Sequence, residues 1–371
     1  MATRSGSFRP HPMSRSSVSN NTIPSNFSSR LLSWYWKVAR DLPWRRTRDP
    51  YAIWVSEIML QQTTVKAVIP YFERWMAKFP TVHRLAKARE EDVLKSWQGL
   101  GYYARARNLH AAARIVSRDM KGEVPQTPEV LRTLPGFGPY TVAAVLSIAY
   151  GVPLPLVDAN VRRVFQRILL IRAGGMGRID ARIRDVLLAL LPRKKPGDFN
   201  QALMELGALV CRSQEPVCNL CPVRSFCRAY EKGLQEVVPT PKVLKVERVR
   251  AAVAIIKKGP LVLVQRRPEK GLLAGLWEFP GGKIDPSDRD PREALERELF
   301  EELGCRSRIG RHLGAVEHSY TRFRVHMDVF EASLVGDVAV GAGRSWVSRE
   351  ALLKKYAMPS GSARILERFL F

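Results

Sequence analysis

The sequence predicts a multidomain protein in which an all-α domain precedes an α+β domain. Before residue 240, strand signals are nearly absent and apolar residues recur at helical spacing in seven stretches: 51–78, 90–120, 128–133, 140–150, 158–171, 180–191 and 199–210. After residue 248 the pattern becomes strand-like at 250–256, 261–265 and 322–330, with a helical run at 291–303. A chain of 371 residues is long enough for two or three such domains.

Composition marks the expected domain boundaries. Residues 1–26 are rich in Ser, Asn and Arg and contain no acid, which predicts a flexible basic tail. A mitochondrial transit peptide shares this composition, and that alternative stays open. We place the helical domain at 27–230, an interdomain linker at 231–247 and the α+β domain at 248–371.

The charge of the chain points to a polyanion as its partner. Sixty Lys and Arg stand against 35 Asp and Glu, giving a net charge of +25 and a pI near 10.3. Residues 1–240 hold 36 basic and 18 acidic residues, whereas residues 241–371 hold 24 and 17. The main nucleic-acid surface is therefore expected in the helical domain. No apolar run approaches the roughly 20 residues that span a bilayer, so no membrane is expected, and the lack of a coiled-coil pattern favours a monomer.

A cysteine cluster predicts a metal site. Four of the five cysteines, Cys211, Cys218, Cys221 and Cys227, fall within 17 residues and follow the spacing C-x6-C-x2-C-x5-C. Zinc and an iron–sulfur cluster both accept four sulfur ligands, and the spacing alone does not separate them. We expect the loop 211–227 to stabilise the end of the helical domain. Cys305 stands alone and is expected to be a small core residue.

A helix–hairpin–helix is predicted over residues 130–150. The hairpin is Leu-Pro-Gly-Phe-Gly-Pro-Tyr-Thr at 134–141, in which Gly136 and Gly138 permit a tight turn. The turn leads into a helix whose N-terminus can hold an anion such as a DNA phosphate. Twenty residues after Gly138, Asp158 opens another helix, where on this pattern alone a plain N-cap is equally expected.

The hairpin, the aspartate after it and the cysteine spacing together resemble the endonuclease III-like superfamily of DNA base-excision glycosylases. This resemblance covers roughly residues 30–230 and implies that the four cysteines hold a 4Fe–4S cluster. Bifunctional members carry a Lys nucleophile at the start of the helix after the hairpin. Tyr140 stands there in this chain and cannot form an imine, which predicts base removal without efficient strand cleavage.

Glu57 is the second expected acid. It lies in the apolar run Ser-Glu-Ile-Met-Leu-Gln-Gln-Thr at 56–63, where desolvation would raise its pKa and suit it to general acid catalysis. A Glu on a solvated helix face would have no such role. This run resembles the adenine DNA glycosylases of MutY type, as do Trp44-Arg45, Asp49-Pro50-Tyr51 and the run Gly-Leu-Gly-Tyr-Tyr-Ala-Arg at 99–105.

The resemblance implies a monofunctional glycosylase of base excision repair that flips adenine out of duplex DNA opposite 8-oxoguanine or guanine. Glu57 would protonate N7 of the base and later activate water, and Asp158 would stabilise an oxocarbenium-like sugar. Tyr140 and Asn160 would orient these acids and the sugar. The implied DNA contacts are Arg45, Leu60, Gln62, Thr63, Tyr102, Gly136 and Gly138. Leu60, Gln62 and Tyr102 are equally compatible with helix core.

The α+β domain resembles a Nudix domain in residues 275–283 (GLWEFPGGK) and 297–304 (RELFEELG). The match is imperfect, because Asp288 stands where Glu is usual and one extra residue separates it from Arg297. In MutY-type enzymes this domain recognises 8-oxoguanine, so recognition rather than pyrophosphate hydrolysis is expected, with Tyr320 and Thr321 contacting DNA. Arg322 departs from the Phe-Ser-His pattern of the family, which leaves the strength of the 8-oxoguanine preference undecided.

Three other functions fit parts of the sequence. A thymine-mismatch glycosylase can also carry Tyr at position 140, but the context of Glu57 and the Nudix-like domain disfavour it. A nucleotide-pool hydrolase fused to a DNA-binding module would act on free nucleotides. A non-catalytic lesion-binding protein is disfavoured because both acids are present. A cytoplasmic, nucleoid-associated location is expected in a bacterium, with nuclear and mitochondrial locations left open.

Overall fold

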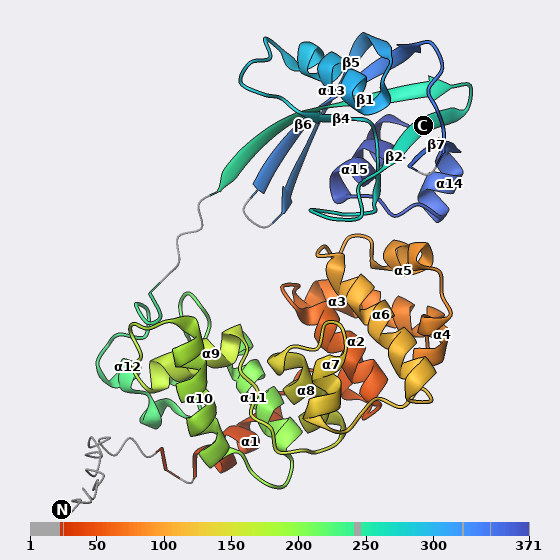
Figure 1. Ribbon diagram of the computed structural model, residues 1–371. Helices are drawn as coiled ribbons and strands as arrows, with labels where there is room; N and C mark the ends of the chain where they lie inside the picture. The colour runs from red at the N-terminus through yellow and green to blue at the C-terminus, as the bar shows by residue number, and fades with distance from the viewer. Residues whose placement is uncertain (1–22, 25, 241–245, 321–322, 342, 371) are drawn as a thin grey trace, which may run out of the picture. The chain divides into compact units, whose positions relative to one another are not determined.

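Helices make up the described chain before residue 240 and a mixed sheet follows, as the sequence predicts (Figure 1). The structure is a computed structural model that describes residues 23–24, 26–240, 246–320, 323–341 and 343–370. Most of the proposed tail 1–26 and linker residues 241–245 lie outside these ranges. Within them, no helix has the length and apolar character needed to cross a membrane.

The chain divides into two compact units. The first comprises the described residues up to Ala39 together with 157–192 and 201–240, and the second comprises 40–156, 193–200 and the residues from 246 onward. Residues 30–230, which resemble the glycosylase superfamily, are thus divided between the two units.

The first unit brings the N-terminal helix onto the cysteine segment. Its elements are α1 (Phe27–Val38), α9 (Ala159–Ile168), α10 (Met176–Leu190), the later part of α11 (Pro196–Leu209), η2 (Cys218–Leu220), η3 (Arg224–Phe226) and α12 (Arg228–Glu231). The Phe27 ring of α1 lies 6.1 Å from the Phe165 ring of α9 and 5.8 Å from the Phe226 ring of η3, centroid to centroid. This aromatic cluster forms part of the core of the unit.

The helical part of the second unit is built around α2 and α8. Its elements are η1 (Pro43–Arg45), α2 (Pro50–Leu60), α3 (Val65–Lys78), α4 (Val82–Ala86), α5 (Glu90–Trp97), α6 (Ala104–Asp119), α7 (Pro128–Thr133) and α8 (Pro139–Ala149). Helix α2 begins where the Asp49 side chain accepts a hydrogen bond from the Tyr51 amide and Pro50 occupies the first turn. Helices α2 and α8 pack against each other, and both are apolar on nearly every side.

Two helices expected from the periodicity are each divided in the structure. The expected helix 51–78 is broken into α2 and α3, and the expected helix 90–120 into α5 and α6. Gln62 has a φ of 57° in the first break, and Gly99, Gly101 and Tyr102 have φ of 103°, 73° and 48° in the second. A residue in the left-handed conformation cannot continue a right-handed helix. The periodic spacing of apolar residues therefore continues across both breaks, while the helical conformation of the backbone is interrupted.

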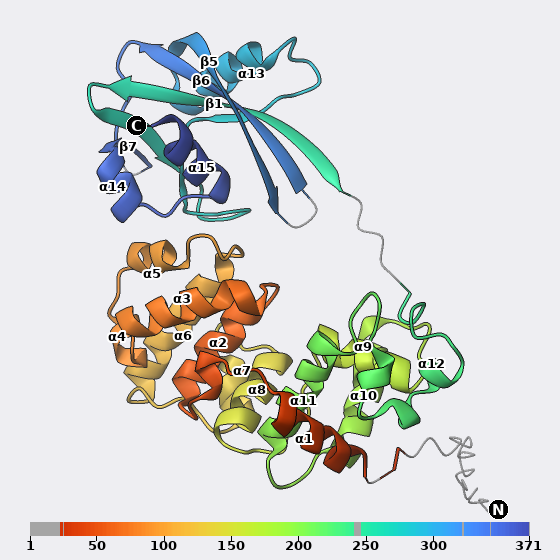
Figure 2. The ribbon, with the colours of Figure 1, turned by 180° about the vertical axis from the view of Figure 1, so that it is seen from behind.

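The C-terminal part contains one mixed sheet covered by helices on both faces (Figures 1 and 2). Its strands are β1 (Glu247–Lys258), β2 (Leu261–Arg266), β3 (Trp277–Glu278), β4 (Gly281–Lys283), β5 (Arg306–Tyr320), β6 (Phe323–Val335) and β7 (Arg344–Ser348). The order is β3-β2-β1-β6-β5, with β4 paired to β1 and β7 to β2. Strands β1 and β6 run parallel, and the other pairs are antiparallel.

Apolar side chains on each face of the sheet explain where the helices lie. Helix α13 (Pro291–Leu303) packs through Leu295 and Leu299 against one face. Helices α14 (Arg349–Lys354) and α15 (Ser360–Phe369) pack through Leu352 and Ile365 against the other. The partly buried Cys305 packs against the α13 side of the core, as the sequence suggested.

Candidate active site

The structure brings Glu57 and Tyr140 together. Glu57 lies near the C-terminal end of α2, is only 4% exposed and is surrounded in sequence by buried apolar residues. Tyr140 lies in the first turn of α8, and its hydroxyl donates a hydrogen bond to Oε2 of Glu57. A buried carboxyl group needs such a partner, because burying a polar group without a hydrogen bond is costly. The packing of α2 on α8 therefore fixes the position of the acid.

The hairpin between α7 and α8 is anchored on the same helix as Glu57. Phe137 at its centre is buried, and its ring centroid lies 4.9 Å from that of Trp54 on α2. Gly136 has a φ of 82°, and a Cβ there would lie 3.0 Å from Cβ of Asn108. Gly136 and Gly138 are both exposed at the start of α8. The turn thus presents backbone rather than side chains to a ligand at the N-terminal end of the helix.

Asp158 and Asn160 form a second polar group, within the first unit. Asp158 is the N-cap of α9: its Oδ1 accepts from the Val161 amide at 2.6 Å. Its Oδ2 accepts from Nδ2 of Asn160 at 3.1 Å. The capping role and a functional role are compatible, because a carboxylate at the N-terminal end of a helix is favoured by the helix dipole.

Arg163 connects Asn160 to the cysteine segment. Its Nη2 donates to Oδ1 of Asn160 and to the Gly207 carbonyl, both at 2.8 Å, and its Nε donates to the Cys211 carbonyl at 2.9 Å. Gly207 is required for this approach, since a Cβ there would lie 2.6 Å from Cβ of Asn160. The side chains of Asp158 and Asn160 are thereby held against the segment that carries the first cysteine.

Arg167, one turn further along α9, touches the cysteine itself. Its Nη1 lies 3.2 Å from Sγ of Cys211 and donates to the Arg212 carbonyl, and its Nε donates to the Val238 carbonyl. Its side chain is 1% exposed. Neither Arg163 nor Arg167 was among the site residues expected from the sequence. The feature of the sequence that could have identified them is their separation by four residues, which places both on one face of α9.

The four thiols line one cavity in the first unit, together with Val164, Ile168, Leu206 and Val223. Within the residues described here, no group of three or more His, Cys, Asp or Glu side chains is arranged as a formed metal site. Burial raises the pKa of Cys221 to about 12 and also raises the pKa values of Cys218 and Cys227. Thiolates in an apolar pocket need a cation to stabilise them, so this donor set fits a sulfur-ligated metal or cluster.

The expected DNA contacts fall at several places in the second unit. Leu60 ends α2, and the exposed Gln62 and half-buried Thr63 follow it in the break before α3. Tyr102 is 43% exposed in the break before α6. Arg45 is half-buried in η1 and donates to the Arg40 carbonyl. Exposure of Gln62 and Tyr102 argues against the core alternative for these two residues.

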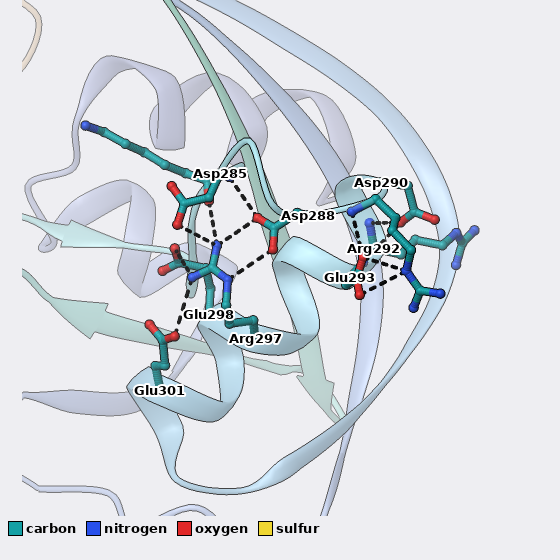
Figure 3. A network of polar contacts seen from close by, with 10 residues as sticks. Asp285, Asp288, Asp290, Arg292, Glu293, Arg297, Glu298 and Glu301 are labelled. Carbon is teal, nitrogen blue, oxygen red and sulfur yellow. Dashed lines mark hydrogen bonds and ion pairs between the residues drawn. The ribbon is translucent and has the colours of Figure 1, made fainter.

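The Nudix-like segment of the C-terminal part carries a network of acids around one arginine (Figure 3). Arg297 on α13 contacts Asp288 at 2.9 Å, Glu298 at 3.0 Å, and Asp285 and Glu301 at 3.5 Å. Glu302 instead accepts a hydrogen bond from the Gly281 amide. The shorter acid Asp288 therefore still reaches Arg297 despite the extra residue between them.

Of the expected reader residues, Tyr320 is the last residue of β5. The backbone of Tyr320 pairs with that of Phe323. Thr321, Arg322 and the side chain of Tyr320 lie outside the described residues.

Two family models match the chain. Residues 55–185 match the HhH-GPD superfamily base excision DNA repair protein, and residues 251–368 match the NUDIX domain. The fold and site therefore define a helix–hairpin–helix base excision DNA repair protein with a C-terminal Nudix domain.

Known relatives show which family within this class the chain belongs to. The adenine DNA glycosylase of Rattus norvegicus is 37% identical over 382 residues, covering 87% of this chain and 74% of the relative. The adenine DNA glycosylase of Schizosaccharomyces pombe is 32% identical over 394 residues, covering 88% and 86%. The solved structure of a thermostable thymine-DNA glycosylase matches 56% of this chain and 95% of its own, with a TM-score of 0.50 and 33% identity. The chain belongs to the family of adenine DNA glycosylases, which hydrolyse an N-glycosidic bond.

Arg297→Met is expected to destabilise the C-terminal part. The Arg297 guanidinium holds the pKa of Asp288 below its ordinary value, so this contribution is present above about pH 4 and is lost as the pH falls further. Thermal unfolding should show a melting temperature several degrees lower for Arg297→Met at pH 7, with a smaller difference below pH 4.

Arg289→Met is the matched control. Arg289 pairs with Glu293 beside the same helix, but its side chain is 84% exposed, so the loss should be small. An equal loss of melting temperature in both variants would show that the network around Arg297 has no special role.

Proposed function

We propose that this protein excises adenine paired with 8-oxoguanine or guanine in duplex DNA and leaves the strand uncut. The observation that carries the proposal is the contact between buried Glu57 and Tyr140 at the junction of α2 and the helix that follows the hairpin. The carboxyl group of Glu57 and the hydroxyl of Tyr140 can donate and accept a proton beside a bound base. The phenol of Tyr140 cannot form an imine with the sugar.

Glu57 supplies the proton that adenine needs to leave. Protonation of N7 makes the purine a better leaving group, and the buried setting excludes competing water. Tyr140 donates to Oε2 of Glu57, which orients the carboxyl group beside the bound base. After the base departs, the Glu57 carboxylate can accept a proton from the attacking water, so one residue serves as acid and then as base.

Asp158 stabilises the positive charge that builds on the sugar. Its two oxygens are held by the Val161 amide and by Asn160, so the carboxylate is oriented before substrate binds. Arg163 fixes Asn160 in turn. Two carboxyl groups in different environments thus serve different steps, as in glycoside hydrolysis.

DNA binding requires the base to leave its stack. The exposed Gln62 and Tyr102, with Leu60 and Thr63 beside Gln62, would fill or probe the vacated space. The exposed glycines of the hairpin would approach a phosphate, and Arg45 would add positive charge near α2. The base opposite the adenine would be read by Tyr320 and Thr321 in the C-terminal part.

Single-turnover base release on two duplexes tests this function. One duplex carries A opposite 8-oxoguanine and the other A opposite G, and alkali reveals the abasic sites. We expect release from both, faster opposite 8-oxoguanine, and no strand cleavage before alkali. Equal rates would contradict the reading of 8-oxoguanine, and release of thymine rather than adenine from mismatches would refute the substrate assignment.

Substitution of the two acids tests the mechanism. Glu57→Gln should lower the rate of adenine release by about 10²–10⁴-fold, the usual contribution of acid–base catalysis. Asp158→Asn should lower it by about 10²–10³-fold, the usual effect of removing one group that stabilises transition-state charge. Glu123→Gln removes an exposed glutamate of the second unit and should leave the rate unchanged. Near-native rates in both acid variants would refute the assigned roles.

We propose further that Cys211, Cys218, Cys221 and Cys227 hold a 4Fe–4S cluster. When bound, the cluster would cross-link the loop 211–227 and stabilise the segment that positions Asn160. Purified protein should contain iron and sulfide, and Cys221→Ser should lower both contents together with the melting temperature. Cys305→Ser is the control and should retain them. Zinc in place of iron would show that the ligand set is right and the cluster is wrong.

A further inference from the structure

Two breaks between helices carry strained residues with exposed side chains. Gln62, in the break 61–64, has a φ of 57°, and Tyr102, in the break 98–103, has a φ of 48°. Residues other than glycine seldom adopt this conformation, which persists only where surrounding contacts enforce it. Because both side chains are exposed, contacts on the neighbouring backbone are needed to enforce it.

Many of those contacts come from Arg105 in the first turn of α6, and Trp97 adds one by donating from Nε1 to the Gly101 carbonyl at 3.0 Å. Its Nη1 donates to the carbonyls of Ile58, Met59 and Gln61 at 2.8, 3.0 and 2.5 Å. Its Nη2 donates to Oγ1 of Thr63 at 3.2 Å and to the carbonyls of Leu100 and Gly101 at 3.1 Å. Arg105 therefore binds both neighbours of Gln62 and the residue before Tyr102.

The six acceptors are neutral, so this arginine does not serve an ion pair. Burial lowers the pKa of Arg105 to about 10, still high enough to keep the guanidinium charged at neutral pH. Its positive charge lies at the C-terminal end of α2, where the helix dipole favours a cation. The guanidinium also lies 5.2 Å from the Trp97 ring centroid and 5.5 Å from that of Tyr102.

We propose that Arg105 is a positioning residue for base flipping, which couples the two breaks so that Gln62 and Tyr102 enter the DNA stack as one rigid element. This inference rests on the proposed function, since it assumes that these two side chains displace the adenine. The planar fork of arginine reaches six acceptors in two segments, which the single ammonium of lysine cannot do.

The test uses 2-aminopurine in place of the target adenine, opposite 8-oxoguanine, because its fluorescence rises on unstacking. In the Glu57→Gln background, which blocks chemistry, binding should raise the fluorescence. Adding Arg105→Lys should abolish most of this rise at saturating protein, while the DNA affinity falls by no more than about threefold because phosphate contacts dominate it. With Glu57 intact, Arg105→Lys should lower single-turnover adenine release by about 100-fold, as a displacement of about 1 Å can do.

Arg107→Lys is the matched control. Arg107 lies on the same helix, is similarly buried and pairs with Glu90 at 3.0 Å. This variant should retain the fluorescence rise. Hydrogen exchange supplies the readout that separates positioning from folding: in Arg105→Lys, amides of 60–64 and 99–103 should exchange faster while those of α8 stay protected.

Each outcome bears on the inference. An undiminished rise in Arg105→Lys, or faster exchange throughout the helical part of the unit, would overturn it. If Arg105→Lys fails to fold, Thr63→Val, which removes one of the six contacts, should still loosen 60–64 and diminish the rise, and its failure to do so would overturn the inference. No rise in the Glu57→Gln parent would refute base flipping itself, whereas a rise that Arg105→Lys leaves intact refutes only the role of Arg105.

Discussion

The hydrogen bond from Tyr140 to Glu57 depends on burying two apolar helices against each other. Helix α2 is apolar on almost every side, so it can lie only at the centre of its unit, and Glu57 is carried inward with it. The partner of the acid must then come from another central element, which is α8. The hairpin before α8 is fixed on α2 by the contact of Phe137 with Trp54. The buried pair of Glu57 and Tyr140 and a turn that exposes backbone thus follow from one packing arrangement.

Partly buried arginines organise the segments that cannot be held by apolar packing. Arg105 binds the carbonyls at two helix breaks, Arg163 joins Asn160 to the Cys211 segment, and Arg297 gathers four acids on the C-terminal part. Irregular backbone exposes carbonyl groups that regular elements would satisfy, and a guanidinium offers five donors in a fixed geometry. These irregular segments are therefore held from within, while side chains such as Gln62 and Tyr102 stay exposed.

Much of this arrangement follows from the sequence, and some of the exceptions depend on contacts between distant residues. The helical and sheet parts, the hairpin and the α13 helix were all predicted, because each rests on local periodicity or on Gly and Pro. The break at Gln62 was missed because no Gly or Pro stands there. The backbone turns because Arg105, more than forty positions away, binds Gln61 and Thr63. Strand β7 depends likewise on pairing with β2, which is distant in the sequence.

The basic residues of the chain form two groups, those that bind within the protein and those that are exposed. The net charge of +25 favours approach to a polyanion, and it acts through the whole field rather than through particular contacts. Arg105, Arg163, Arg167 and Arg297 already use most of their donors within the protein, so they add to that field rather than serve as phosphate ligands. Direct phosphate contacts must come from the exposed basic residues and from backbone amides such as those of the hairpin. Salt should therefore weaken the binding of DNA while leaving the internal geometry of the site intact, because exposed charges are screened and buried hydrogen bonds are not.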